Sequence, residues 1–203
     1  MGVLQICLIV AVAWAALALT AQVLLARGGG RREFTWAAGR PLRGVLYNFT
    51  VALLPSHKES ARLHPAEFIA GVLLHVGVLA ALAEILVLPV SADFALIGLR
   101  VLAGLGAVAA LVLLVRRVRS PLLRALSSPD DYVAVLATGG LLVLAAFPAL
   151  ASGALLRAYA TLLFVYLPLG KLRHAVFFFV ARADYGWRLG YRGVYPPARG
   201  KEP

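Results

Sequence analysis

The chain of 203 residues contains a single cysteine, Cys7. One cysteine excludes an internal disulfide, a Cys-x-x-Cys-His haem attachment site and an iron–sulfur cluster held by this chain alone. Any iron–sulfur chemistry associated with the protein must therefore belong to a partner.

Acidic residues are also scarce: nine Asp and Glu stand against twenty Lys and Arg, for a net charge of +11. In a soluble protein such an excess suggests nucleic-acid binding. Here all the basic residues except Arg100 and Arg157 fall on one side of the apolar segments described next. The basic side of a membrane protein is typically cytoplasmic. We therefore expect no nucleic-acid partner, an N-terminus outside, a C-terminus inside, and an inner face that attracts anionic lipid or an acidic partner.

Long polar stretches are missing as well. Hydrophobic residues make up 62% of the chain and the mean hydropathy is +0.87, whereas globular proteins are about 45–50% apolar. The excess is concentrated in five runs, each close to the roughly 20 helical residues that cross a hydrocarbon core of about 30 Å. The runs are Val3–Ala26, Ala66–Pro89, Phe94–Val115, Tyr132–Leu150 and Leu156–Ala181. We predict an all-α fold: one integral membrane domain over residues 1–203, a five-helix bundle in the cytoplasmic membrane.

Two connections carry helix signals of their own. The segment Val45–Pro55 is too short to cross the bilayer, and its aromatic residues suit the headgroup boundary, so we predict a short interfacial helix there. Before the fourth run, Ser127-Ser128-Pro129-Asp130-Asp131 combines a serine cap, a proline in the first turn and acids beside the helix N-terminus. This pattern predicts an ordered helix start on the inner side.

Two histidines, His75 and His174, lie inside otherwise apolar runs. Ionisable side chains in membrane helices are costly and generally functional. At a rise of about 1.5 Å per residue, His75 lies roughly 13 Å and His174 roughly 10 Å from the inner ends of their runs. Imidazoles at similar depth on two helices can serve as both axial ligands of one haem iron. We predict one bis-histidine haem b held by this pair.

Residues near the pair fit such a site, although each has a simpler explanation. Gly71 and Gly77 would leave room for a flat macrocycle, but glycine is common in membrane helices. Lys171 could meet a haem propionate with Arg173 adjacent, yet both could equally anchor their helix at the interface. Similarly, a lone membrane histidine often only forms a hydrogen bond between helices.

The other two histidines, His57 and His64, precede the second run in a polar setting. Solvation or helix capping explains them better than ligation of a metal. A second bis-histidine haem would need two more membrane histidines, which the chain does not have.

Three segments resemble the respiratory nitrate reductase gamma-subunit family of membrane cytochromes b. They are His75-Val76-Gly77-Val78-Leu79, Arg116-Arg117 followed by Pro121, Arg124, Ser127, Ser128 and Asp131, and Leu167-Pro168-Leu169-Gly170-Lys171-Leu172-Arg173-His174. The stretch Lys58-Glu59-Ser60-Ala61-Arg62-Leu63-His64 and the Lys-Leu-Arg-His ending are more similar to the sulfur-metabolism and heterodisulfide-reductase-type relatives. The resemblance covers most of residues 40–195.

This resemblance implies five helices, haem b, menaquinone or ubiquinone as substrate, and an iron–sulfur or molybdenum partner on one membrane face. In the nitrate-type pattern a second histidine follows ten residues after the first on the second helix. That position here is Ile85, and its counterpart on the fifth helix falls near Leu156. The resemblance therefore implies that only the cytoplasmic-side haem is retained, and the family's outer quinone site is put in doubt.

Glu84 and Arg100 lie at similar depth near the outer ends of the second and third runs. The simplest account is a buried pair of opposite charges. Alternatively, Glu84 could accept protons released when a quinol is oxidised. A quinone pocket at the inner ends of the second, third and fifth helices competes equally with this placement.

The sequence thus predicts the haem-b subunit of an oxidoreductase complex, which exchanges electrons between the quinone pool and an iron–sulfur or other redox partner on the cytoplasmic side. The alternative from a different class is a haem-free anchor subunit. A small transporter would show an internal repeat, and the sequence contains no convincing one.

Overall fold

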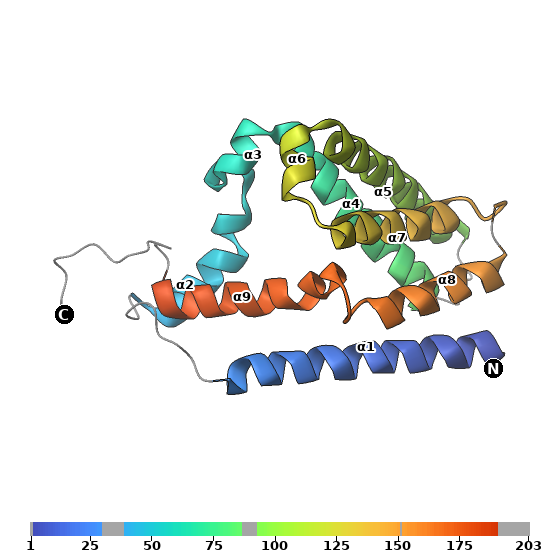
Figure 1. Cartoon of the computed structure of the whole chain (residues 1–203), viewed down its shortest axis with the longest axis horizontal. Helices are drawn as coiled ribbons and strands as arrows, with labels where there is room; N and C mark the ends of the chain where they lie inside the picture. Colours follow the sequence, from blue (N-terminus) through green and yellow to red (C-terminus); the bar gives the residue numbers. More distant parts are fainter. Residues whose placement is uncertain (1, 30–38, 87–92, 151, 191–203) are drawn as a thin grey trace. The chain divides into compact units, whose positions relative to one another are not determined.

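In the computed structural model the described residues are 2–29, 39–86, 93–150 and 152–190, and all of their regular secondary structure is helical (Figure 1). This confirms the predicted all-α class. The elements are α1 (Val3–Gly28), α2 (Pro41–Phe49), η1 (Val51–Leu53), η2 (Pro55–His57), α3 (Glu59–Leu63), α4 (Pro65–Leu86), α5 (Asp93–Arg119), α6 (Pro121–Leu126), α7 (Pro129–Ala146), α8 (Gly153–Tyr166), η3 (Lys171–Arg173) and α9 (His174–Leu189). They form two compact units, the first of Met1–Leu17 with His64–Leu172 and the second of Ala18–Leu63 with Arg173–Pro203.

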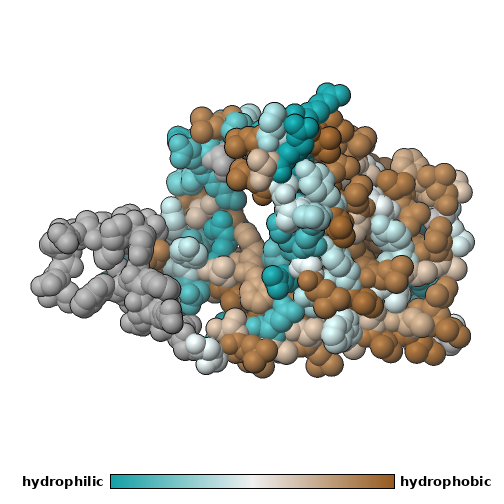
Figure 2. Space-filling model, viewed as in Figure 1, coloured by the Kyte–Doolittle hydropathy of each residue, from teal (hydrophilic) through white to brown (hydrophobic). Residues whose placement is uncertain are grey.

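Among the described residues, four helices are long and apolar enough to cross a membrane: α1, α4, α7 and the segment Phe94–Arg119 of α5. A fifth candidate consists of α8 and Lys171–Leu189, which are separated by a break. Hydrophobic residues dominate the visible surface along α8 and the first half of α1 (Figure 2). Val3, for example, is 77% exposed. Such a surface suits hydrocarbon rather than water, and the chain is a multi-pass membrane protein.

The ends of the predicted spans shift for local reasons. The helix predicted over Phe94–Val115 continues through Arg119, because the first breaker is Pro121, which holds Ser120 in an extended conformation. The helix predicted to reach Leu150 ends at Ala146, since Pro148 has no N–H to donate to the preceding turn. Residues 87–89 of the second predicted span lie outside the described residues.

The interfacial helix lies earlier in the chain than predicted. The prediction of a helix over Val45–Pro55 is wrong at both ends, because α2 begins at Pro41 and ends at Phe49. Pro41 occupies the first helical turn, where its missing N–H costs nothing and its φ is already helical. Two short 3₁₀ turns, η1 and η2, follow in place of a longer helix.

The continuous helix predicted over Leu156–Ala181 is divided. Helix α8 ends at Tyr166, a turn over residues 167–170 follows, and η3 precedes α9. Pro168 cannot donate a hydrogen bond to the turn before it. Instead, the N–H groups of Leu169 and Gly170 both donate to the Tyr166 carbonyl. The Leu-Pro-Leu-Gly segment therefore closes one helix and starts another.

Close packing of small residues builds the core of the first unit. Gly77 on α4 faces Gly106 on α5, where a Cβ added to Gly77 would lie 2.8 Å from the Gly106 Cα. No side chain fits between backbones at this distance, so the two glycines allow α4 and α5 to touch. On the neighbouring pair, the Tyr159 hydroxyl of α8 donates to the Ala137 carbonyl of α7 at 3.1 Å and covers Gly140.

The second unit is built around an antiparallel pair, α2 and α9. Gly44 and Gly186 meet backbone to backbone, since a Cβ on Gly186 would lie 2.5 Å from the Val45 Cα. One turn along, the Arg182 guanidinium donates to the Asn48 carbonyl at 2.8 Å, and the Asn48 amide donates to the Arg182 carbonyl. The pair ends with Phe49 stacked on Phe179 at 6.1 Å between ring centroids.

Candidate functional site

His75 lies on an exposed face of α4 in the first unit. Its Nδ1 is 2.6 Å from the carbonyl oxygen of Gly71, one turn earlier in the helix. A carbonyl can only accept a hydrogen bond, so this contact assigns the ring proton to Nδ1 and, in the neutral ring, the lone pair to Nε2. A hydrogen bond from one ring nitrogen to a backbone carbonyl, which fixes the tautomer, is typical of metal-ligating histidines.

The surroundings of His75 are apolar and partly open. Ile69, Val72 and Leu79 lie on the same exposed side of α4. A Cβ placed on Gly71 would meet no heavy atom within 4 Å, so there is open space one turn from the imidazole. The prediction that Gly71 leaves room beside His75 is therefore compatible with the structure.

Gly77 has a different explanation from the one predicted. It is buried against Gly106 and the Leu102 carbonyl. Its missing side chain is needed for contact between α4 and α5, which leaves no space for a macrocycle at this position. The proposed role of Gly77 in cofactor binding is therefore wrong for a physical reason: the space is already filled by another helix.

His174 is the first residue of α9 in the second unit, and it is exposed. The depth predicted for it was counted along a continuous helix, and that count does not apply because the helix is broken before it. Its neighbour Arg173 is exposed as well and occupies the N-cap position of α9, where its side chain makes no capping hydrogen bond. Shared ligation of one iron by His75 and His174 stays a prediction.

The break before His174 is held by the two acids at the start of α7. The Tyr166 hydroxyl donates to Asp130 Oδ1, and the backbone N–H of Lys171 donates to Asp130 Oδ2 at 2.7 Å. The Lys171 ammonium pairs with Asp131, whose other oxygen lies 3.4 Å from Arg117 Nη1. We call these five residues the acidic clamp. It joins the end of α8 to the starts of α7 and η3.

The acidic clamp changes the interpretation of Lys171. The sequence suggested that Lys171 could contact a haem propionate, but its ammonium group is paired with Asp131. An ammonium group that is already paired with one carboxylate binds a second carboxylate, such as a haem propionate, only weakly. The alternative, an anchoring role, fits the observed contacts better.

The predicted helix start at Ser127–Asp131 is confirmed, and it does more than the sequence indicates. The N–H and hydroxyl of Ser128 both donate to Asp131 Oδ2, at 2.8 and 3.0 Å, as expected of a helix cap. The contacts of these acids with Tyr166 and Lys171 were missed. The only sequence signal for them was an acidic pair and a Tyr–Lys pair at the facing ends of two antiparallel helices.

Glu84 and Arg100 form the predicted pair of opposite charges. Arg100 Nε and Nη2 both lie 3.2 Å from Glu84 Oε1. The Glu84 side chain is 12% exposed, and its second oxygen, Oε2, is buried with no hydrogen-bond partner among the described residues. The guanidinium binds Oε1, and Oε2 offers a site for a proton or a hydrogen-bond donor.

The remaining histidines match the simpler prediction. His57 is exposed and its Nδ1 lies 3.0 Å from the Ser56 hydroxyl, and His64 is exposed just before α4. Across the described ranges, no group of three or more His, Cys, Asp or Glu residues could hold a metal ion. A bis-histidine haem requires only two protein ligands.

Replacing Asp131 by Asn should destabilise the first unit. The neutral amide loses the ion pairs with Lys171 and Arg117 and leaves two cations without their counter-charge. We expect a loss of about 1–3 kcal/mol in the free energy of unfolding, measured by thermal unfolding in detergent. Asp184→Asn is the matched control, because its i,i+4 pair with Arg188 is longer, at 3.6 Å, and its side chain is 44% exposed, so the substitution should cost less, about 0.3–0.5 kcal/mol for such a pair. Equal effects of the two substitutions would contradict the role of the clamp.

Comparisons with protein-family models, with curated proteins and with solved structures found no match. The geometry above therefore carries the functional argument, and the resemblance to nitrate reductase gamma subunits stays a prediction from motifs.

Proposed function

We propose that this chain is the haem-b membrane subunit of an oxidoreductase complex and transfers electrons between quinone and a redox partner at its basic face. The observation that carries the proposal is the state of His75. Its Nδ1–H is bound to the Gly71 carbonyl, which places the lone pair on Nε2, and the imidazole sits on an apolar, exposed face beside open space. Placing an imidazole in a membrane helix costs free energy, so such residues generally have a functional role.

In this proposal His75 and His174 would be the two residues that hold the haem iron. When bound, haem b supplies a one-electron centre whose potential depends on its ligands, burial and nearby hydrogen bonds. The Gly71 carbonyl orients the His75 ring and fixes its tautomer. Gly71 itself leaves the adjoining helix surface without a side chain. Arg173 and His174 together begin α9, so their positions are fixed by the same turn.

The proposed orientation in the cytoplasmic membrane is N-out and C-in. The support is the distribution of basic residues, of which only Arg100 and Arg157 fall on the other side. The acidic clamp adds a structural reason, because it brings Lys171 and Arg117 onto one carboxylate and thus onto one face. An iron–sulfur partner with an acidic surface would dock at this basic face.

Glu84, together with Arg100, is proposed to form the site that takes up protons from the quinol. Oxidation of a quinol releases two protons that need acceptors. Glu84 Oε2 is a buried carboxylate oxygen with no donor among the described residues. Arg100 is bound to the other oxygen, Oε1, so a proton from the quinol would go to Oε2.

The haem content of the full-length protein tests the proposal. We expect a dithionite-reduced minus oxidised spectrum of b type and a pyridine haemochrome count of one haem per chain. His75→Ala and His174→Ala should each abolish it, while His57→Ala and His64→Ala, which remove exposed histidines elsewhere, should keep it. A colourless wild-type protein would favour the haem-free anchor, and two haems per chain would overturn the one-haem assignment.

Glu84→Gln tests the proton role separately. The amide cannot accept the proton, so we expect quinol-dependent reduction of the haem to slow at least tenfold, within the range of general-base effects. Reduction by dithionite should be unchanged, because it bypasses the quinol. Glu59→Gln, at an exposed position of α3, is the control. An undiminished quinol-dependent rate would remove Glu84 from the mechanism.

A further inference from the structure

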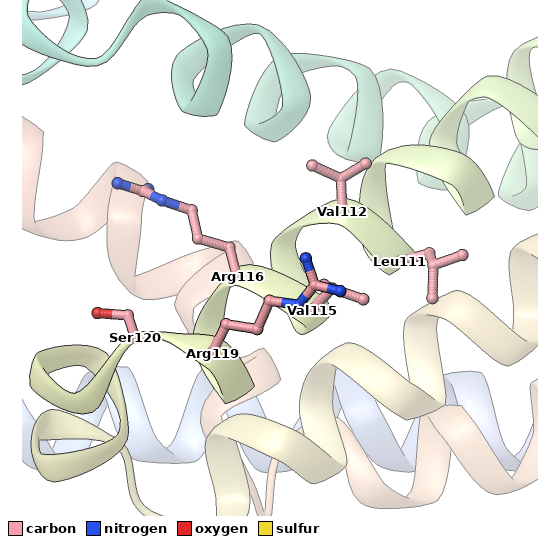
Figure 3. Close-up of a pocket in the computed structure, with 6 residues that line it drawn as sticks. All are labelled: Leu111, Val112, Val115, Arg116, Arg119 and Ser120. Atoms are coloured by element: carbon pink, nitrogen blue, oxygen red, sulfur yellow. The ribbon is translucent and has the colours of Figure 1, made fainter.

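A groove runs along the last turns of α5. It has a volume of about 650 Å³ and is lined by Leu111, Val112, Val115, Arg116, Arg119 and Ser120 (Figure 3). All of these residues belong to the first unit. The groove therefore combines an apolar floor with two guanidinium groups at one end.

The arginines at the end of α5 differ in their partners. Arg116 lies 2.9 Å from Glu67 and Arg117 lies 3.4 Å from Asp131. Arg119 is exposed and has no ion-pair partner within the part of the chain that the structure describes. The groove thus carries one positive charge that the bundle itself does not neutralise.

The apolar end of the groove lies in the candidate span Phe94–Arg119. Leu111 and Val112 are 60% and 53% exposed. Leu111 precedes Arg119 by eight residues, which corresponds to about 12 Å along a helix. The groove therefore extends from the arginines at the end of this candidate span into its apolar part.

We propose that this groove binds one anionic phospholipid. Its phosphate contacts the Arg119 guanidinium with Arg116 beside it, because arginine matches the oxygens of a phosphate with paired donors. An acyl chain lies along Leu111, Val112 and Val115. A free phosphate would leave that apolar floor uncovered, and an acidic soluble protein cannot reach residues within the span.

This site is independent of the haem and the quinone. It gives the basic face a specific lipid contact in addition to the general attraction between cationic residues and anionic headgroups. It also accounts for the unequal pairing of three neighbouring arginines: two are used within the bundle, and one is available for a ligand.

The test compares lipid retention by native mass spectrometry after reconstitution in equal mixtures of phosphatidylglycerol and phosphatidylcholine. We expect the full chain to retain phosphatidylglycerol at least fivefold over phosphatidylcholine, and Arg119→Gln to lose this preference. Arg124→Gln is the matched control, because Arg124 is also exposed, lies outside the groove and has no ion-pair partner among the described residues. It removes the same charge and should keep the preference.

Three outcomes would overturn the proposal: no preference in the wild type, equal loss in both variants, which would indicate a diffuse basic surface, or a preference retained in Arg119→Gln. Inorganic phosphate at millimolar concentration provides a further arm. If it displaces the lipid, the site recognises the phosphate alone and the acyl contact is refuted. Thermal unfolding of both variants checks that the fold is intact.

Discussion

Hydrocarbon offers no hydrogen bonds, and this constraint decides where polar side chains can lie in the spans of this protein. Two ionisable side chains in the apolar helices of the first unit, those of His75 and Glu84, are bound to named groups. Nδ1 of His75 bonds the Gly71 carbonyl, and Glu84 is bound by Arg100. Against this background, the buried Oε2 of Glu84 is conspicuous, and it is the atom to which we assign proton chemistry.

The three acidic residues that contact α5 are likewise explained by their partners. Glu67, Glu84 and Asp131 each pair with an arginine of α5, so a small number of carboxylates fixes α5 to α4 and α7. Asp131 also holds Lys171, which locates the break before α9. Because basic residues outnumber acidic ones, positive charge is left over that can contact lipid headgroups or a partner protein. This agrees with the positive-inside distribution.

The sequence predicted what depends on local signals and missed what depends on packing. Apolar runs located the long helices, and Ser128 with Asp131 located the start of α7. The break at Pro168 was overlooked because the apolar run continues through it, although proline and glycine two residues apart are a helix-ending signal. The sequence could not decide the role of Gly77, because a glycine that allows contact with another helix and one that makes room for a cofactor look alike in sequence. The partner of Lys171 depends on how α7 and α8 pair, which no local pattern encodes.

The proposed electron transfer depends on ligation of a haem iron by Nε2 of His75. Low-temperature electron paramagnetic resonance of the oxidised full-length protein tests it most directly, since two imidazole ligands give low-spin ferric haem. We expect a low-spin signal that disappears or turns high-spin in His75→Ala and is unchanged in His64→Ala. A low-spin signal that survives in His75→Ala, or no ferric haem signal in the wild type, would contradict it.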